Sequence, residues 1–222
     1  MPRVSEDYYE KKRKEIVEAA YRVCVRKPIT SVVMSDVIAE TGFSHGVVYK
    51  YYKDLDDIIR DLVVSINSEN RMDERVDMII TKSSDKDWQD IIREICSMMA
   101  EHMQAVDIDV LKISLYSDML AMSDPERVTR IAGTIGEENQ SPLLSLVVAV
   151  HNYLSKVMQE KKLTPIKNID EIIEFMIASY HGIQTGYVLS KSYDANQLRG
   201  KYDPDKMFSC LAESMIFMME GR

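Results

Sequence analysis

Between residues 38 and 54 the chain reads Ile38-Ala39-Glu40-Thr41-Gly42-Phe43-Ser44-His45-Gly46-Val47-Val48-Tyr49-Lys50-Tyr51-Tyr52-Lys53-Asp54. The stretch joins two short helices with apolar residues at helical spacing through a turn that contains glycine. Gly42 is placed to end the first helix, and Ser44 is placed to cap a second helix over Gly46–Tyr52. This order is the outline of a helix-turn-helix, whose second helix lies in the major groove of DNA.

The flanking residues extend this helical pattern. A first helix carries an apolar face of Ile16, Ala19, Ala20, Val23 and Cys24, and Pro28 stops it. The helix that contains Met34 and Val37 takes Thr30 or Ser31 as its expected cap. Asp54 is expected to cap a fourth helix, from Leu55 to about Ile80.

Glu15 to Val63 resembles the DNA-binding domain of the TetR family of bacterial transcriptional repressors. The ordered stretch from Ile38 to Asp54 is similar to the family's turn, Tyr-containing helix and Lys-Asp ending, and Ile16 to Ala20 matches its first helix. The resemblance implies that Phe43, Val48 and Tyr52 pack the core of this domain. It places DNA contacts at Ser35, Ser44, His45, Gly46, Val47, Tyr49, Lys50, Tyr51 and Lys53.

Purely structural alternatives to the DNA-binding interpretation exist for two features. The three short helices also fit a mere packing unit. The basic run Lys11–Lys14 is either a solvated face of the first helix or an arm that contacts phosphate.

The rest of the chain is also predicted to be helical, so the fold class is all-α with two domains. Residues 1–60 form the predicted helix-turn-helix domain. The resemblance implies that residues 61–222 form an effector-binding and dimerisation domain. Lys82 to Asp87 is interpreted as a linker, and Asp124-Pro125, Ser141-Pro142, Asn168 and Asp203-Pro204 are predicted helix starts.

In the family, a late pair of long helices forms a four-helix interface with a second copy. Ser141–Lys161 and Ile169–Lys191 are the corresponding apolar helices, and small residues on one face favour close approach of two helices. The alternative is close packing within one subunit. The predicted dimer residues are Leu143, Val147, His151, Ser179, Gly182 and Gly186.

Methionine is concentrated in the larger domain: of 15 methionines, all but Met1 and Met34 follow residue 60. Flexible, polarizable side chains suit an adaptable apolar cavity, although a plain hydrophobic core explains them as well. In the cavity interpretation His102 and Tyr116 orient the ligand. The predicted lining is Ile95, Met99, His102, Met103, Leu115, Tyr116, Met119 and Phe175.

Composition excludes several other classes of protein. The net charge is −8, which argues against a chain that coats nucleic acid along its whole surface. Three distant cysteines, Cys24, Cys96 and Cys210, predict buried free thiols in a reducing cytosol, and no signal peptide or membrane span is apparent. No metal-binding or nucleophile motif occurs, so no cofactor, metal or catalysis is predicted.

These observations predict a cytoplasmic, ligand-responsive repressor. It would bind a near-palindromic DNA operator as a homodimer and be released by a small-molecule effector. The alternative is a helical small-molecule-binding or enzymatic protein with a vestigial DNA-binding domain. Repression and activation are not separable from the sequence.

Overall fold

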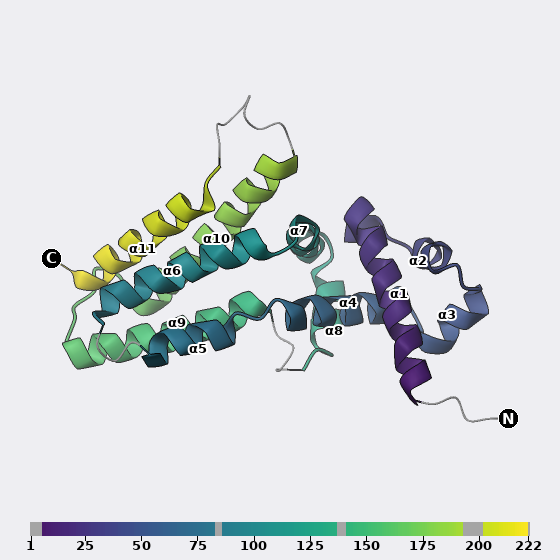
Figure 1. The fold of residues 1–222 in the computed structure, drawn as a ribbon, viewed down its shortest axis with the longest axis horizontal. Helices are drawn as coiled ribbons and strands as arrows, with labels where there is room; N and C mark the ends of the chain where they lie inside the picture. Colours follow the sequence, from purple (N-terminus) through teal and green to yellow (C-terminus); the bar gives the residue numbers. More distant parts are fainter. Residues whose placement is uncertain (1–5, 83–85, 137–140, 193–201, 222) are drawn as a thin grey trace. The chain divides into compact units, whose positions relative to one another are not determined.

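The computed structural model describes residues 6–82, 86–136, 141–192 and 202–221, and within these ranges it contains helices and no strand (Figure 1). The predicted all-α fold class is therefore confirmed. The elements are α1 (Glu6–Arg26), the 3₁₀ turn η1 (Ile29–Ser31), α2 (Met34–Thr41), α3 (His45–Tyr51), α4 (Leu55–Glu69), α5 (Asp73–Lys82), α6 (Trp88–Ala105), α7 (Ile108–Ser123), α8 (Pro125–Ala132), α9 (Pro142–Lys161), α10 (Ile169–Ser192) and α11 (Pro204–Glu220).

The chain packs into two compact units. The first combines residues 1–69 with 109–140, and the second combines 70–108 with 141–222. The first unit therefore holds α1 to α4, nearly all of α7, and α8. The predicted boundary after residue 60 separates a DNA-binding domain from an effector-binding domain. It stays a prediction, because the packing of the two units does not show which function each one has.

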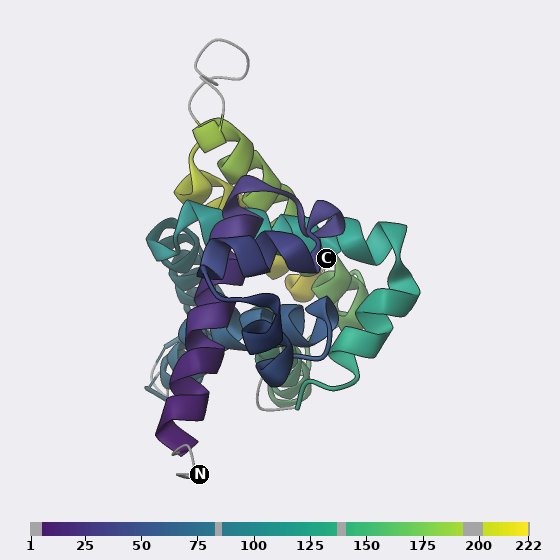
Figure 2. The same cartoon turned by 90° about the vertical axis from the view of Figure 1, so that its right-hand side faces the viewer.

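In the first unit α1 is the central helix, and α2, α3 and α4 pack against it (Figure 2, where α1 is purple). The predicted apolar face of α1 is buried, with Ile16, Ala19 and Ala20 at 0% exposure. The two alanines lack bulk, so neighbouring helices can approach α1 closely. Ile113, Leu120 and Ile131 of α7 and α8 belong to the same hydrophobic cluster.

The second unit contains α5, α6, α9, α10 and α11. α6 packs against α11, α5 packs against α6 and α9, and α10 packs against α9 and α11. Its core contains Met99, Met103, Leu154 and Phe208, each at 0% exposure. Burying such side chains contributes roughly 1.5–3 kcal/mol each to folding.

Local signals set most helix ends as predicted. The Asp54 carboxylate accepts the Asp57 N–H at 3.0 Å, and the Asp124 carboxylate accepts the Arg127 N–H at 3.0 Å. Asn168 and Glu171 cap each other reciprocally, since the Glu171 N–H donates to Asn168 and the Asn168 N–H donates to Glu171. Such caps satisfy backbone donors that a helix start leaves without partners.

Two predictions about helix ends are wrong, and a third is correct only in its position. The helix from Leu55 ends at Glu69 and a separate helix starts at Asp73, where Asp73 and Glu74 supply the acidic first turn. Thr30 and Ser31 lie in η1 and do not cap α2, which begins after Val33. Ser44 stands at the cap position of α3, but its side chain makes no capping hydrogen bond.

The cysteine prediction is correct for two of the three thiols. Cys24 and Cys96 are buried, and burial raises their pKa values to about 11 and about 12. Cys210 is exposed on α11, against the prediction, because it lies on the outer side of that helix next to buried Leu211. All three are free thiols.

The predicted linker Lys82 to Asp87 falls partly outside the described residues, which omit 83–85. Lys82 is the last residue of α5, and Asp87 directly precedes α6. None of the described helices has the length and apolar composition of a membrane span. The described residues also contain no group of three His, Cys, Asp or Glu side chains that would hold a metal ion.

Candidate nucleic-acid interface

The turn between α2 and α3 is fixed by one glycine and one threonine. Gly42 adopts φ +69°, a left-handed conformation that side-chain-bearing residues rarely take. The Thr41 hydroxyl donates to the Ile38 carbonyl at 2.7 Å and accepts the Phe43 N–H at 3.0 Å. The predicted role of Gly42 is confirmed, whereas the hydrogen bonds of Thr41 were not anticipated.

Most of the predicted DNA-contacting residues are exposed, and they lie on α2, on α3 or within two residues of the ends of α3. Val47 and Tyr49 are 38% and 52% exposed, although large apolar and aromatic side chains are usually covered in folded proteins. The exposed members of the predicted set are Ser35, Ser44, His45, Gly46, Val47, Tyr49, Lys50 and Lys53. We call this set the α3 face.

Tyr51 does not belong to the α3 face. Its side chain is only 7% exposed, and its ring lies 4.9 Å from the ring of Tyr9 of α1. The backbone carbonyl of Tyr51 accepts a hydrogen bond from Arg13 at 3.3 Å. Tyr51 thus lies on the buried side of α3, one turn from Val48, so its side chain is not among the exposed residues of α3, and its contact with DNA stays a prediction.

The predicted core residues of the motif are largely buried. Val48 is 0% exposed and Tyr52 is 2% exposed. Phe43 is half-buried and packs against the first-unit cluster, with the Lys12 ammonium 4.4 Å from its ring centre. A cation at this distance from an aromatic face is attracted by the ring electrons.

A charged network joins α1, the end of α3 and α4. The Asp61 carboxylate accepts hydrogen bonds from Arg13, from the Tyr52 hydroxyl at 2.9 Å and from Arg60 at 3.2 Å. The Arg13 guanidinium also lies 4.5 Å from the Tyr52 ring centre. Burial and the neighbouring Asp61 charge raise the pKa of the Tyr52 hydroxyl, so it remains a proton donor. We call these residues the Asp61 clamp.

Two further ion-pair groups tie α1, and the residue after it, to α2. Glu40 accepts from Arg22 and Arg26, and Asp36 accepts from Lys27 and from the Val33 N–H. The bonds from Arg22 and Lys27, respectively, are the main reason that the pKa values of the two carboxylates are lowered. The positive charges of Arg22, Arg26 and Lys27 are therefore paired with carboxylates of the same chain.

The basic residues Lys11–Lys14 of α1 include both paired and exposed cations. Lys12 pairs with Glu15 at 2.6 Å, and Arg13 belongs to the Asp61 clamp. Lys11 and Lys14 are exposed. Lys50 and Lys53 are also exposed, and neither forms an ion pair with another described residue. The α3 face therefore presents cations whose charge the rest of the described chain leaves unneutralised.

The predicted effector residues do not form one group. Ile95, Met99 and Met103 are buried in the second unit, and half-buried His102 lies on the same helix, α6. Leu115, Tyr116 and Met119 lie on α7 in the first unit, where Tyr116 packs against the first-unit cluster. Met119 and Phe175 are 46% and 43% exposed, so they line no enclosed cavity.

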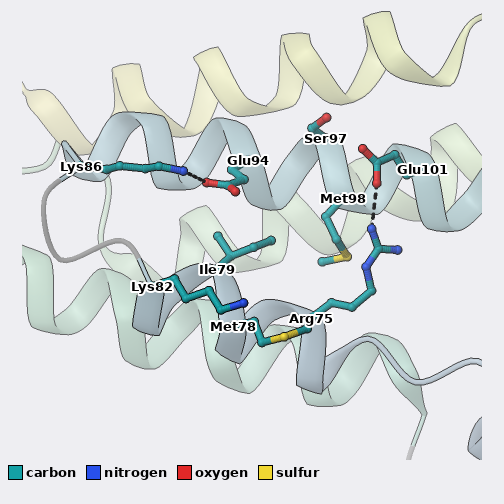
Figure 3. Close-up of a pocket in the computed structure, with 9 residues that line it drawn as sticks. All are labelled: Arg75, Met78, Ile79, Lys82, Lys86, Glu94, Ser97, Met98 and Glu101. Atoms are coloured by element: carbon teal, nitrogen blue, oxygen red, sulfur yellow. Dashed lines mark hydrogen bonds and ion pairs between the residues drawn. The ribbon is translucent and has the colours of Figure 1, made fainter.

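The structure instead forms a pocket between α5 and α6, entirely within the second unit (Figure 3). Its volume is about 400 Å³, and none of the predicted effector residues lines it. The sequence pattern did not reveal it because α5 was interpreted as a continuation of α4. The lining residues are Arg75, Met78, Ile79, Lys82, Lys86, Glu94, Ser97, Met98 and Glu101.

The predicted dimer residues occupy different environments. Gly182 is exposed, and a methyl group added there would meet no atom within 4 Å. At Gly186 an added methyl group would collide with the ring of Tyr202 in the same chain. For Gly186 the alternative interpretation, packing within one subunit, therefore holds. Ser179 and the α9 residues Leu143, Val147 and His151 are partly buried.

The comparisons with known proteins agree with this architecture. No protein-family profile matches the chain. Over 62 residues, 28% of this chain, it is 37% identical to an uncharacterized HTH-type transcriptional regulator, YfiR, of Bacillus subtilis (strain 168). The matched region spans only 30% of that relative's length.

Solved structures with similar folds cover nearly the whole chain. A TetR-family transcriptional regulator from Cytophaga hutchinsonii has a TM-score of 0.59 at 15% identity, covering 99% of this chain and 100% of its own. FadR from Bacillus subtilis, in complex with stearoyl-CoA, has a TM-score of 0.62 at 14% identity, covering 91% and 97%. Salmonella enterica GusR has a TM-score of 0.61 at 11% identity, covering 98% and 99%.

A helix-turn-helix with an exposed second helix, together with a second helical unit, defines a two-unit all-helical fold. More particularly, the chain has the fold of the TetR-family transcriptional regulators.

Proposed function

We propose that the chain is a cytoplasmic, ligand-responsive transcriptional repressor that binds a near-palindromic DNA operator as a homodimer, without catalysis. The observation that carries the proposal is the α3 face. It exposes Lys50, Lys53 and the Tyr49 hydroxyl, while the other cations of the motif are largely held in ion pairs. Lysines and hydroxyls are suited to phosphate contacts, and exposed residues at the start of α3 are placed to meet base edges.

The surfaces of α9 and α10 support a dimer. Between Phe175 and Leu189 of α10, the exposed positions are spaced alternately three and four residues apart and carry apolar or small side chains: Phe175, Ala178, Gly182, Thr185 and Leu189. On neighbouring α9, Leu144 and Val148 are 45% and 52% exposed. Such stripes fit helix-to-helix packing with a second copy. The proposed interface therefore includes Gly182, as predicted from the sequence. On α9 we propose the exposed Leu144 and Val148 as contacts in place of the partly buried Leu143, Val147 and His151.

A dimer also meets the geometry of DNA. Two recognition helices must reach successive major grooves, roughly 34 Å apart, to read a near-palindrome. A ligand that binds the DNA-competent and DNA-incompetent states with different affinities would then control operator binding. The stearoyl-CoA complex of FadR supports a ligand-responsive role for this fold.

Selection of bound duplexes from a random DNA pool tests the proposal. The purified full chain is expected to enrich one near-palindromic sequence at moderate salt. The variant Tyr49→Phe/Lys50→Ala is expected to lose most of that enrichment, whereas the variant Lys156→Ala, at an exposed lysine of α9, should retain it. A selected duplex would also serve as a probe for effectors that release it.

The alternative function makes the opposite prediction. A helical small-molecule-binding or enzymatic protein with a vestigial DNA-binding domain would enrich no sequence and bind duplex DNA negligibly even at low salt. That result would contradict the repressor proposal.

A further inference from the structure

The pocket between α5 and α6 is formed by matching faces of two helices. Each helix contributes residues at positions i, i+3, i+4 and i+7, which lie on one side of a helix. They are Arg75, Met78, Ile79 and Lys82 on α5, and Glu94, Ser97, Met98 and Glu101 on α6. Lys86 completes the lining from the segment before α6.

The chemistry changes along this pocket. Its middle is apolar, formed by Met78, Ile79 and Met98, and Figure 3 shows Ile79 of α5 and Met98 of α6 extending into the gap between the helices. Met98 is 3% exposed and forms a fixed wall, whereas Met78 is 48% exposed and leaves an apolar surface uncovered. Methionine side chains adapt to apolar groups of varied shape.

The two ends are charged and unequal. At one end Arg75 pairs with Glu101 at 2.7 Å, so the charges balance. At the other end Lys86 pairs with Glu94 at 2.6 Å on the α6 side, and Lys82 lines the pocket from α5, with its side chain running along that helix (Figure 3). Among the described residues Lys82 forms no ion pair. This end therefore has one positive charge in excess, on a chain whose net charge is −8.

We infer that this pocket binds an amphipathic anion, a carboxylate or phosphate monoester attached to an apolar chain. The anionic group binds at the Lys82 end, and the chain runs along Met78, Ile79 and Met98 toward the Arg75–Glu101 pair. A volume of about 400 Å³ falls within the size range of small-molecule sites. A cationic ligand is disfavoured because Lys82 repels it. An anion without an apolar chain leaves the methionine surface uncovered.

A ligand in this position contacts both α5 and α6, so it favours the spacing of these helices that fits it best. As an account of the effector, this inference rests on the proposed function. As an account of binding, it stands without DNA.

Isothermal titration calorimetry of the full chain tests the site with four probes: decanoate, decyl phosphate, decyltrimethylammonium and acetate. We expect decanoate or decyl phosphate to bind at one per chain, and the comparison of these two identifies the preferred anion. Decyltrimethylammonium and acetate should bind at least tenfold more weakly, the first through charge repulsion and the second through loss of the apolar contact.

Lys82→Met is the decisive variant, because it keeps an apolar stem and removes the charge. It should weaken binding of the preferred anion about tenfold or more. Lys156→Met, at a lysine on α9 that is 70% exposed and does not line the pocket, is the matched control and should bind like the unchanged chain. Circular dichroism confirms that both variants fold.

Several outcomes overturn the inference: no binding of either anion, equal binding of decyltrimethylammonium, or unchanged affinity in Lys82→Met. Adding the preferred anion to the complex with a selected duplex separates the two proposals. Release of DNA supports an effector site. If the anion binds but does not release DNA, the pocket is a binding site without an effector role. If the chain does not bind DNA at all, the repressor proposal is refuted, and the calorimetric test of the pocket still stands.

Discussion

The two compact units are stabilised in different ways. In the first, short helices are tied by specific ionic contacts: the Asp61 clamp joins α1, α3 and α4, and Glu40 joins α2 to two arginines of α1. In the second, the helices pack around apolar residues such as Phe208 and Met99, and the ion pair that joins α6 to α11, Arg93 with Glu213, is exposed. Paired charges stabilise the helix-turn-helix, whereas unpaired lysines lie on the surfaces that we propose as binding sites. Lys50 and Lys53 lie on the proposed DNA surface, and Lys82 lines the proposed anion pocket.

The largest effect is expected from a substitution that disrupts the apolar packing of the second unit. Phe208→Ala should lower the free energy of unfolding by about 3–5 kcal/mol, because a fully buried phenyl ring is replaced by a cavity. Urea titration followed by circular dichroism measures the change. Phe217→Ala on the same helix is the control, since Phe217 is 58% exposed and its loss should change stability by about 0.5 kcal/mol or less. Equal effects of the two variants would refute the assigned packing of α11.

Breaking the Asp61 clamp should have the next largest effect. Asp61→Ala leaves the buried Tyr52 hydroxyl without its acceptor and removes one of the two acceptors of Arg13, so the free energy of unfolding should fall by roughly 1.5–3 kcal/mol. Tyr52→Phe removes only one hydrogen bond and should cost about 1 kcal/mol. The same urea titration compares them. If Asp61→Ala destabilises no more than Tyr52→Phe, the clamp does not act as a network.

A pair of glycine variants separates the DNA-facing and partner-facing surfaces. Gly46 on α3 and Gly182 on α10 are both helical, and an added methyl group meets no atom within 4 Å at either site. Alanine should therefore stabilise each isolated helix by up to about 1 kcal/mol. We expect Gly46→Ala to weaken DNA binding and leave the dimer intact, and Gly182→Ala to weaken the dimer.

Sedimentation equilibrium and DNA binding by fluorescence anisotropy distinguish these effects. If Gly182→Ala dimerises as well as the unchanged chain, α10 does not approach a second copy at this position.

The smallest effect concerns pH. Burial, with a smaller contribution from the Arg75 charge, lowers the pKa of His102 below its usual 6.5. The unfolded chain then takes up a proton more readily than the folded chain, so stability falls as the pH drops from about 6.5 toward 5. His102→Gln should reduce this fall, whereas stability above pH 7 should change much less with pH. Urea titrations at several pH values measure it, and an unchanged pH profile in His102→Gln would show that His102 does not contribute.

Local signals made much of the first unit predictable. A left-handed Gly42, the Asp54 cap and the apolar face of α1 each depend on a few neighbouring residues, so the sequence pattern reveals them. Tyr51 was assigned to the DNA surface from the family resemblance, and its burial against Tyr9 of α1 depends on a tertiary contact that the motif alone does not display.

The second unit depends on contacts that the sequence does not display. No proline or glycine marks the break between Glu69 and Asp73, so α5 was not recognised and its pairing with α6 could not be foreseen. Gly186 was assigned to a partner because the Tyr202 ring that covers it lies in another segment of the chain. Tertiary packing, not local propensity, decides which face of each long helix is covered.

The salt dependence of DNA binding tests the central claim most directly. Fluorescence anisotropy with a selected duplex, at increasing salt, is measured for the unchanged chain and for Lys50→Ala/Lys53→Ala. If both lysines bind phosphate, log affinity should fall steeply with log salt, and the slope should be shallower in the variant by about 2 per chain. Equal slopes, or binding that does not respond to salt, would contradict the assignment of the α3 face to DNA.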